Sequence, residues 1–219
     1  MHCFRHHQEC NDFFWISPHK STFMINRNLI CLILLIGLVE VSCKRMVKGS
    51  GEMITDERIT GNFETVEIKG AAVIEITKGS GYKVEVKSYE NIVHLIETSV
   101  KNNKLTVSTG EDVSITNSEI TIHITAPTIE TVILSGAGDL AISGFHQSMM
   151  KLKLQGAGNI RFSGSECDTV YATLTGAGNM YVNAKDYLDA NLNGIGNIEY
   201  AGDPTVKSKI SGLGNVSKK

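Results

Sequence analysis

The sequence predicts an all-β fold, a parallel β-solenoid whose coils hold 18 to 20 residues. Three observations predict it: one short phrase recurs, its glycines are regularly spaced, and apolar residues alternate on both sides of it. A fixed period of about twenty residues is typical of solenoids. The five copies are SGAGDL from Ser135, QGAGNI from Gln155, TGAGNM from Thr175, NGIGNI from Asn193 and SGLGNV from Ser211.

The residues around each phrase alternate as they do in β-strands. In the second copy, Leu152 and Leu154 precede the first glycine, and Ile160 and Phe162 follow the second one. The other copies repeat this alternation, which has the period of two that strands show. Each repeat is therefore predicted to be two short strands joined at Gly-x-Gly.

The Gly-x-Gly step is predicted to be a corner, because glycine adopts backbone conformations that a Cβ atom would penalise. The residue between the glycines is apolar in every copy, so we expect it to turn into the core. These middle residues are Ala137, Ala157, Ala177, Ile195 and Leu213. The corner glycines are Gly136, Gly138, Gly156, Gly158, Gly176, Gly178, Gly194, Gly196, Gly212 and Gly214.

A polar residue follows the second glycine of every copy. Equivalent residues of adjacent parallel strands lie about 4.8 Å apart, so these side chains are predicted to form a ladder of amides that ties the coils together. Alternatively, asparagine stands there because it tolerates a left-handed turn conformation. The ladder residues are Asp139, Asn159, Asn179, Asn197 and Asn215.

Residues 1–23 match nothing that follows and are interpreted as an upstream extension that is not native. Histidines and cysteines cluster near the start of this segment, but no second ligand pair follows at zinc-finger spacing. No metal site is therefore predicted, and Met24 is the expected start. The clustered residues are His2, Cys3, His6, His7 and Cys10.

Residues 24–43 are predicted to be a secretory signal. Arg27 precedes an apolar run of eleven residues, which is too short to span a bilayer comfortably. Because a small residue precedes Cys43, the segment resembles the lipobox of bacterial lipoproteins, in which the cysteine is lipidated. Glu40 departs from that pattern, so plain secretion and an uncleaved membrane anchor stay open.

Residues 44–58 are polar and contain glycine, which favours a tether between the anchor and a folded head of residues 59–219. The head begins with a degenerate copy of the repeat, because FETVEIKGAA from Phe63 aligns with IETVILSGAG from Ile129. The strands between these two copies are predicted to be less regular, with a helix or turn at residues 89–97.

The stretch VEIKGAAVIEITKG, the strand before Pro127, the phrase TVILSGAG and the GAGN copies resemble the head GIN domain of the auto-transporter adhesin family of Bacteroidetes-type bacteria. The resemblance covers residues 59–217. It implies a right-handed, single-stranded parallel β-helix in an exported protein, often a lipoprotein. The expected location is the cell envelope, with a lipid anchor at the outer membrane, on its periplasmic or its surface side.

Composition and motifs exclude several classes of ligand. The formal net charge of −2 leaves no basic patch for nucleic acid. Gly-x-Gly-Asn lacks the third glycine and the following helix of a dinucleotide loop. The calcium-binding glycine-rich nonapeptide has half this period and uses aspartate. No cofactor is expected.

No catalytic constellation is recognised in the repeats. Asp168 and Asp186 are predicted to lie in stacked loops, where they could form a weak cation site or simply be solvated. Cys167 has no neighbouring cysteine, and it would be the remaining one after lipidation at Cys43, so no intrachain disulfide is expected. The other histidines are far apart and are expected at the surface or partly buried: His94, His123 and His146.

The expected function is a non-catalytic cell-envelope head domain that displays a β-helical surface for adhesion or assembly, with the membrane as a partner through Cys43. Tyr171, Tyr181 and Tyr187 are candidate contacts for a glycan or a protein ligand, or else scattered exposed tyrosines. Two other functions stay open. One is a polysaccharide lyase or hydrolase that uses loop acids, and the other is a structural module that forms homo-oligomers through open solenoid ends.

Overall fold

The computed structural model describes residues 45–110, 113–116 and 118–219. The upstream extension, the signal and Cys43 lie outside the described residues. The described part is almost entirely strand, which confirms the all-β prediction, and its one helix is a single turn, α2 (Glu90–Val93). This turn lies inside the segment 89–97 where a helix or turn was predicted. None of the described residues form a helix that is long and apolar enough to cross a bilayer.

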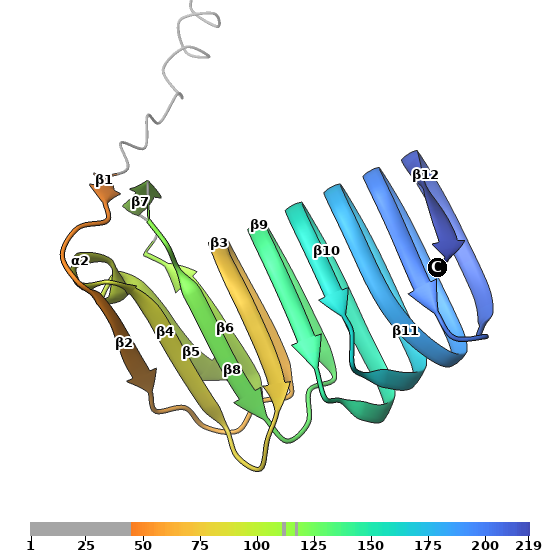
Figure 1. Cartoon of the computed structure of the whole chain (residues 1–219), viewed down its shortest axis with the longest axis horizontal. Helices are drawn as coiled ribbons and strands as arrows, with labels where there is room; N and C mark the ends of the chain where they lie inside the picture. The colour runs from red at the N-terminus through yellow and green to blue at the C-terminus, as the bar shows by residue number, and fades with distance from the viewer. Residues whose placement is uncertain (1–44, 111–112, 117) are drawn as a thin grey trace, which may run out of the picture. The chain divides into compact units, whose positions relative to one another are not determined.

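Figure 1 shows the order of the strands. They are β1 (Arg45–Lys48), β2 (Met53–Arg58), β3 (Thr65–Lys78), β4 (Lys83–Tyr89), β5 (Ile96–Lys101), β6 (Lys104–Thr109), β7 (Val113–Thr116), β8 (Thr121–Ala126), β9 (Thr131–Ser143), β10 (His146–Phe162), β11 (Glu166–Ala201) and β12 (Thr205–Lys218).

The glycine repeats form a parallel array of β3, β9, β10, β11 and β12, which are neighbours in this order (Figure 1). β11 contains two repeats. The phrases pair in register, since Gly136 pairs with Gly156 and Gly156 pairs with Gly176. The pairing of Gly70 with Gly136 confirms that the segment from Phe63 is a degenerate copy of the repeat.

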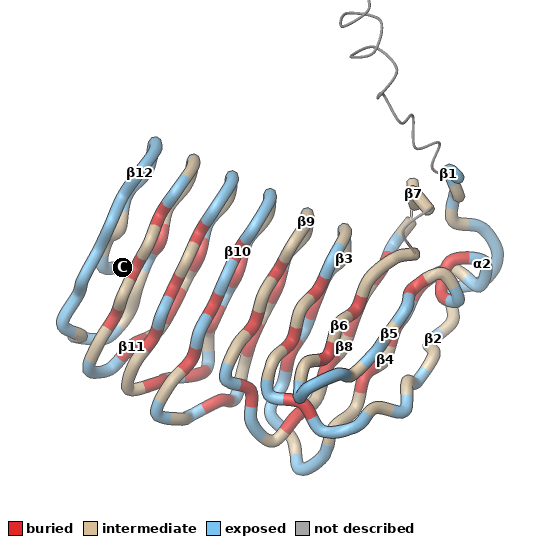
Figure 2. Tube along the Cα trace, turned by 180° about the vertical axis from the view of Figure 1, so that it is seen from behind, coloured by how far each residue is buried: buried red, intermediate tan, exposed pale blue. Residues whose placement is uncertain are grey.

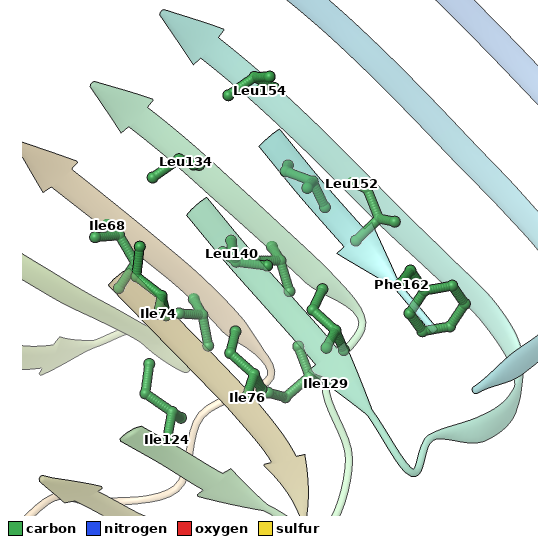
Figure 3. Packing of buried hydrophobic residues seen from close by; sticks show 14 of the residues in the cluster. Ile68, Ile74, Ile76, Ile124, Ile129, Leu134, Leu140, Leu152, Leu154 and Phe162 are labelled. Atoms are coloured by element: carbon green, nitrogen blue, oxygen red, sulfur yellow. The ribbon is translucent and has the colours of Figure 1, made fainter. Parts of the chain in front are cut away.

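Each repeat has two arms that meet at the Gly-x-Gly corner. We call the residues before the corner the leading arm and those after it the trailing arm; in β10 these are residues 151–155 and 159–162. Buried and exposed positions alternate along both arms (Figure 2). The buried side chains fill the space between the arms, where Leu152, Leu154 and Phe162 of β10 lie beside Leu134 and Leu140 of β9 (Figure 3).

The N-terminal half of the sheet is mixed, as the less regular pattern there predicts. β6 and β8 run parallel to β3, but β4 is antiparallel to β8, β2 to β4 and β5 to β6. Asn102 and Asn103 join β5 to β6 with φ values of 51° and 57°, which are those of a two-residue hairpin turn. So short a link forces antiparallel pairing, and the parallel arrangement expected for residues 59–219 does not extend through this half.

The segment expected to be a tether, residues 44–58, contains two paired strands instead. β1 pairs with β7, and β2 pairs with β4. Between them, the side chain of Asn91 donates to the carbonyl of Lys48 and accepts from the backbone N–H of Ser50, both at 2.8 Å. The sequence of β2 does not show a strand pattern, because charged residues such as Asp56 and Arg58 occupy half-buried positions where apolar residues would be expected.

β12 forms one edge of the sheet, and nearly all of its residues are exposed (Figure 2). Ile210 is 44% exposed, although its register partner Leu192 is buried. Lys207 and Lys209 also lie on this strand, and lysines on an edge strand disfavour pairing with another chain. Oligomerisation through this end stays a prediction.

Cys167 lies in the core near the start of β11, with 1% of its surface exposed. Burial raises the pKa of its thiol to about 11 from the ordinary 9.0. The stabilising effect of the neutral buried thiol is therefore present below pH 9.0 and lost as the pH rises toward about 11. The free energy of unfolding of the wild type, measured relative to Cys167→Ala, should fall across this interval.

Iodoacetamide supplies the second measurement on Cys167. At a pH of about 8 it should modify this thiol slowly in the native chain and rapidly in guanidinium, because the thiolate is the reactive form and the native thiol is buried. Peptide mapping separates Cys167 from the other cysteines. Equal rates in both conditions would contradict the burial of this residue.

Candidate functional site

The Gly-x-Gly corner continues the alternation of the strand. In the first repeat of β11, Leu174 and Met180 are buried, and Gly176 and Gly178 lie between them as an exposed and a half-buried position. These glycines have positive φ values of 122° and 148°. A Cβ atom on Gly176 would lie 3.0 Å from the carbonyl carbon of Gly156 in the neighbouring repeat. The corner glycines therefore allow adjacent repeats to approach closely, and a larger residue would collide with the neighbouring backbone.

The prediction that the middle residue of each corner turns into the core is wrong. Ala177 is exposed, and so are the larger side chains Ile195 and Leu213, at 60% and 72%. Alternation places the middle residue on the side opposite to the buried Leu174 and Met180. Burial does not explain why these residues are apolar.

The side chains that follow the corner are hydrogen bonded from repeat to repeat. Asn159 Nδ2 donates to Asp139 Oδ1 at 2.7 Å. Asn179 donates to Asn159 Oδ1 through its backbone N–H at 3.2 Å and through Nδ2 at 3.3 Å, and Asn197 does the same to Asn179 Oδ1. The backbone N–H of Asn215 donates to Asn197 Oδ1 at 3.2 Å. These residues form a continuous ladder.

This ladder presents donors to the solvent. The Oδ1 atoms of Asn159 and Asn179 each accept two hydrogen bonds, which uses both lone pairs of a carbonyl oxygen. Each of their Nδ2 groups carries two hydrogens and gives one of them to the ladder. One N–H of each amide thus remains for an exogenous acceptor.

Replacing Asn179 by alanine should lower the free energy of unfolding by about 1 kcal/mol or more, because the side-chain hydrogen bonds to Asn159 and from Asn197 are lost. Denaturant unfolding followed by circular dichroism measures the change. Asn193→Ala is the control, since Asn193 is an exposed asparagine of the same array outside the ladder. Equal losses in both variants would show that the ladder adds no stability.

The outward side chains of the trailing arms form a surface that we call the trailing face. Two positions after the ladder residue, successive repeats carry Arg161, Tyr181 and Glu199, and Arg161 pairs in register with Tyr181. A hollow of about 740 Å³, the trailing-face hollow, lies over these side chains. The ladder residues Asn159, Asn179 and Asn197 line it as well, together with Ile160, Ser163, Met180 and Lys219.

Two cationic side chains, Arg161 and Lys219, line the trailing-face hollow. The ammonium of Lys219 lies 4.7 Å from the centroid of the Tyr181 ring, a cation–π distance. Among the described residues, neither Arg161 nor Lys219 has a carboxylate within ion-pair distance. Glu199 is the one acidic side chain of the lining. Two cations without ion-pair partners therefore face the hollow.

A second hollow, of about 260 Å³, continues the trailing face toward β3 and shares Asn159 and Arg161 with the first. Its far side is acidic, with Asp139 and Glu75 in the lining. Glu75 also lies 3.1 Å from the imidazole of His123, which points outward as expected. The trailing face thus changes from acidic near β3 to basic near Arg161.

The structure separates the three candidate tyrosines. Tyr171 and Tyr187 meet on the leading-arm side, with ring centroids 6.5 Å apart and an interplanar angle of 64°. Tyr171 is 39% exposed. Tyr181 lies in the trailing-face hollow instead. The rings therefore do not form one shared platform.

Asp168 and Asp186 lie within β11, so their placement in loops is wrong. The carboxylate of Asp168 lies 3.9 Å from the ammonium of Lys185, which makes it part of a solvent-exposed ion pair. No group of three or more His, Cys, Asp or Glu side chains that could hold a metal ion occurs in residues 45–110, 113–116 and 118–219.

Sequence reasoning singled out Tyr181 but missed Arg161, Glu199 and Lys219 as parts of one site. A signal for the first two exists, because they occupy the same place in their repeats as Tyr181 does. Residues at one place in successive repeats lie about 4.8 Å apart. The position of Lys219 over the ring depends on a side-chain conformation and has no such signal.

Comparison with known families decides where this array belongs. The model of the family described as "putative auto-transporter adhesin, head GIN domain" matches residues 62–175 and, in a second match, residues 150–204. The chain belongs to this head GIN domain family. The matches contain the array from β3 through β11, with Arg161, Tyr181 and Glu199 of the trailing face. They confirm the resemblance drawn from the repeated phrases.

Solved structures share the fold of this head GIN domain. One is a "putative adhesin" from Bacteroides fragilis, with a TM-score of 0.56 and 22% identity over 79% of this chain and 100% of that one. Another is a "putative lipid binding protein" from Parabacteroides distasonis, with a TM-score of 0.51 and 16% identity over 80% of this chain and 100% of that one. No curated protein matches the head GIN domain chain.

Proposed function

We propose that this head GIN domain is a non-catalytic component of the cell envelope that binds its ligand through the trailing-face hollow. The observation that carries the proposal is a concave site of about 740 Å³ in which charged and amide side chains surround one aromatic ring. Sites that bind ligands combine such a concavity with a few convergent polar groups. The adhesin description of the family points in the same direction.

The lining of the hollow supports binding rather than catalysis. Most glycoside hydrolases use two carboxyl groups that flank the glycosidic bond. Glu199 is the one carboxylate of the hollow, and neither histidine nor cysteine takes part in the lining. The acidic residues of the neighbouring hollow belong to other repeats, near β3.

We also propose that the parallel array winds as a right-handed solenoid that displays this surface. Crossovers between parallel strands are right-handed in about 98% of cases. The repeats that carry the trailing face follow one another with 18 or 20 residues per turn, which keeps their outward side chains in rows.

A lipid on Cys43 is the proposed attachment to the envelope. Only Lys44 separates Cys43 from β1, so the anchor would hold β1 at the membrane surface, and Arg45 and Lys48 would lie near anionic headgroups. In a bacterial host, cells fed a palmitate analogue should label the full chain but not Cys43→Ser. Labelling of both the wild type and the Cys43→Ser variant, or of neither, would contradict lipidation at Cys43.

An adherence assay tests the binding surface. Bacteria that express the full chain are applied to immobilised polysaccharides, glycoproteins and matrix proteins. The variant Arg161→Gln/Tyr181→Ala should reduce retention by about tenfold or more, because a few central residues dominate most binding sites. The matched control is Lys153→Gln/Tyr171→Ala, which removes one cation and one tyrosine from the leading-arm side. Loss of retention in the control alone would move the site away from the trailing face.

A further inference from the structure

Building on the proposed function, we infer that the trailing-face hollow takes an acidic sugar chain, whose carboxylates are met by Arg161 and Lys219. Three features of the described residues select this ligand class. They are the free N–H donors of Asn159 and Asn179, the two cationic side chains of the hollow that have no ion-pair partner, and the distribution of charge along the trailing face.

The ladder selects a ligand that is rich in acceptors. The amide oxygens of Asn159 and Asn179 are already saturated by the next repeat, so the free groups of these side chains are N–H donors. Such donors recur at the spacing of adjacent strands, about 4.8 Å. Ring oxygens, hydroxyls and carboxylates of a sugar chain laid across the strands would present acceptors in a similar succession.

The cations select a negative charge within that ligand. Arg161 and Lys219 face the same hollow and have no carboxylate within ion-pair distance among the described residues. A guanidinium binds a carboxylate through two parallel hydrogen bonds. Toward β3, Asp139 and Glu75 would repel a further carboxylate, which confines the charged sugar units to the repeats from Arg161 onward.

Other polyanions fit the hollow less well. A nucleic acid carries a phosphate on every nucleotide and needs a row of cations, whereas the chain has a net charge of −2 and the hollow holds two cations and one acid. An acidic peptide would need an unpaired strand edge or an apolar anchor pocket. The trailing arms of β10 and β11 in the hollow are paired on both sides, and Lys219 is the one lining residue that belongs to the repeat of the edge strand β12. Tyr181 and the amides suit a sugar ring instead.

Titration calorimetry of the full chain with oligogalacturonate and oligomannuronate tests the inference. The matched probes are the same oligomers after methyl esterification, which removes the charge and keeps the sugar chain. At least one acid oligomer is expected to bind. Esterification should weaken its binding by about tenfold or more. Arg161→Gln/Lys219→Gln should weaken binding to a similar degree, and added salt should weaken it further.

The control is Lys151→Gln/Lys153→Gln, which removes the same charge from exposed positions of the leading arm and should leave the affinity unchanged. Equal losses in the two double variants would mean unspecific attraction and overturn the inference. Equal binding of acid and ester, still sensitive to Tyr181→Ala, would overturn the acidic ligand but keep the binding site. No binding of any acid oligomer would also overturn it, and the adherence assay would then decide separately whether the trailing face binds anything.

Discussion

Gly178→Ala should lower the free energy of unfolding by about 4 kcal/mol. The new Cβ would overlap the carbonyl oxygen of Gly158 and lie 2.9 Å from its carbonyl carbon, and this neighbour is backbone that cannot turn aside. Alanine would also have to adopt a φ of 148°. Overpacking costs about 1 to 3 kcal/mol, and a strained backbone conformation costs a similar amount.

Guanidinium unfolding of Gly178→Ala measures this loss, with Gly81→Ala as the matched control. A Cβ atom on Gly81 would have no other atom within 4 Å, and the φ of Gly81 lies outside the positive range that penalises alanine. The control should change stability by less than about 0.5 kcal/mol. A Gly178→Ala chain as stable as the control would mean that adjacent corners do not pack as closely as described.

Phe162→Ala should cost about 3 to 5 kcal/mol, because it deletes a fully buried aromatic side chain from the space between the two arms. Phe162 pairs in register with the buried Ile142 of the preceding repeat, so the cavity would open inside the stack of side chains rather than at its end (Figure 3). Denaturant unfolding again gives the change.

Two further variants serve as comparisons for Phe162→Ala. Phe162→Leu refills part of the cavity and should lose less stability than the alanine variant. Tyr171→Ala removes an aromatic ring that is 39% exposed and should have a much smaller effect. If Phe162→Ala lost no more stability than Tyr171→Ala, the packing between the arms would be refuted.

The repeat and its register could be predicted from the sequence because the glycines mark equivalent backbone positions. A Cβ atom at a corner glycine would collide with the backbone of the neighbouring repeat, which explains why glycine recurs at the same place in the repeats. The orientation of the corner could not be read as easily. Apolar residues such as Leu213 suggested an inward turn, whereas counting the alternation through both glycines places them outward.

The N-terminal half was harder to predict because it depends on local links. The hairpin at Asn102 and Asn103 carries a turn signal that is weaker than Asn-Gly, and pairing of β2 with β4 joins segments distant in sequence. The trailing-face hollow was predictable in part. The places of Arg161 and Glu199 follow from the period, but their joint significance needed the register of the array.

The order of the ladder has a consequence for Asp139. The side-chain amides of Asn159, Asn179 and Asn197 each donate toward the preceding repeat, so their dipoles align head to tail. Their positive ends add up at Asp139, as backbone dipoles do at a helix N-terminus, and aligned hydrogen bonds polarise one another. A carboxylate at this end stabilises the whole row of dipoles, which is a physical reason for aspartate in the first copy and asparagine in the others.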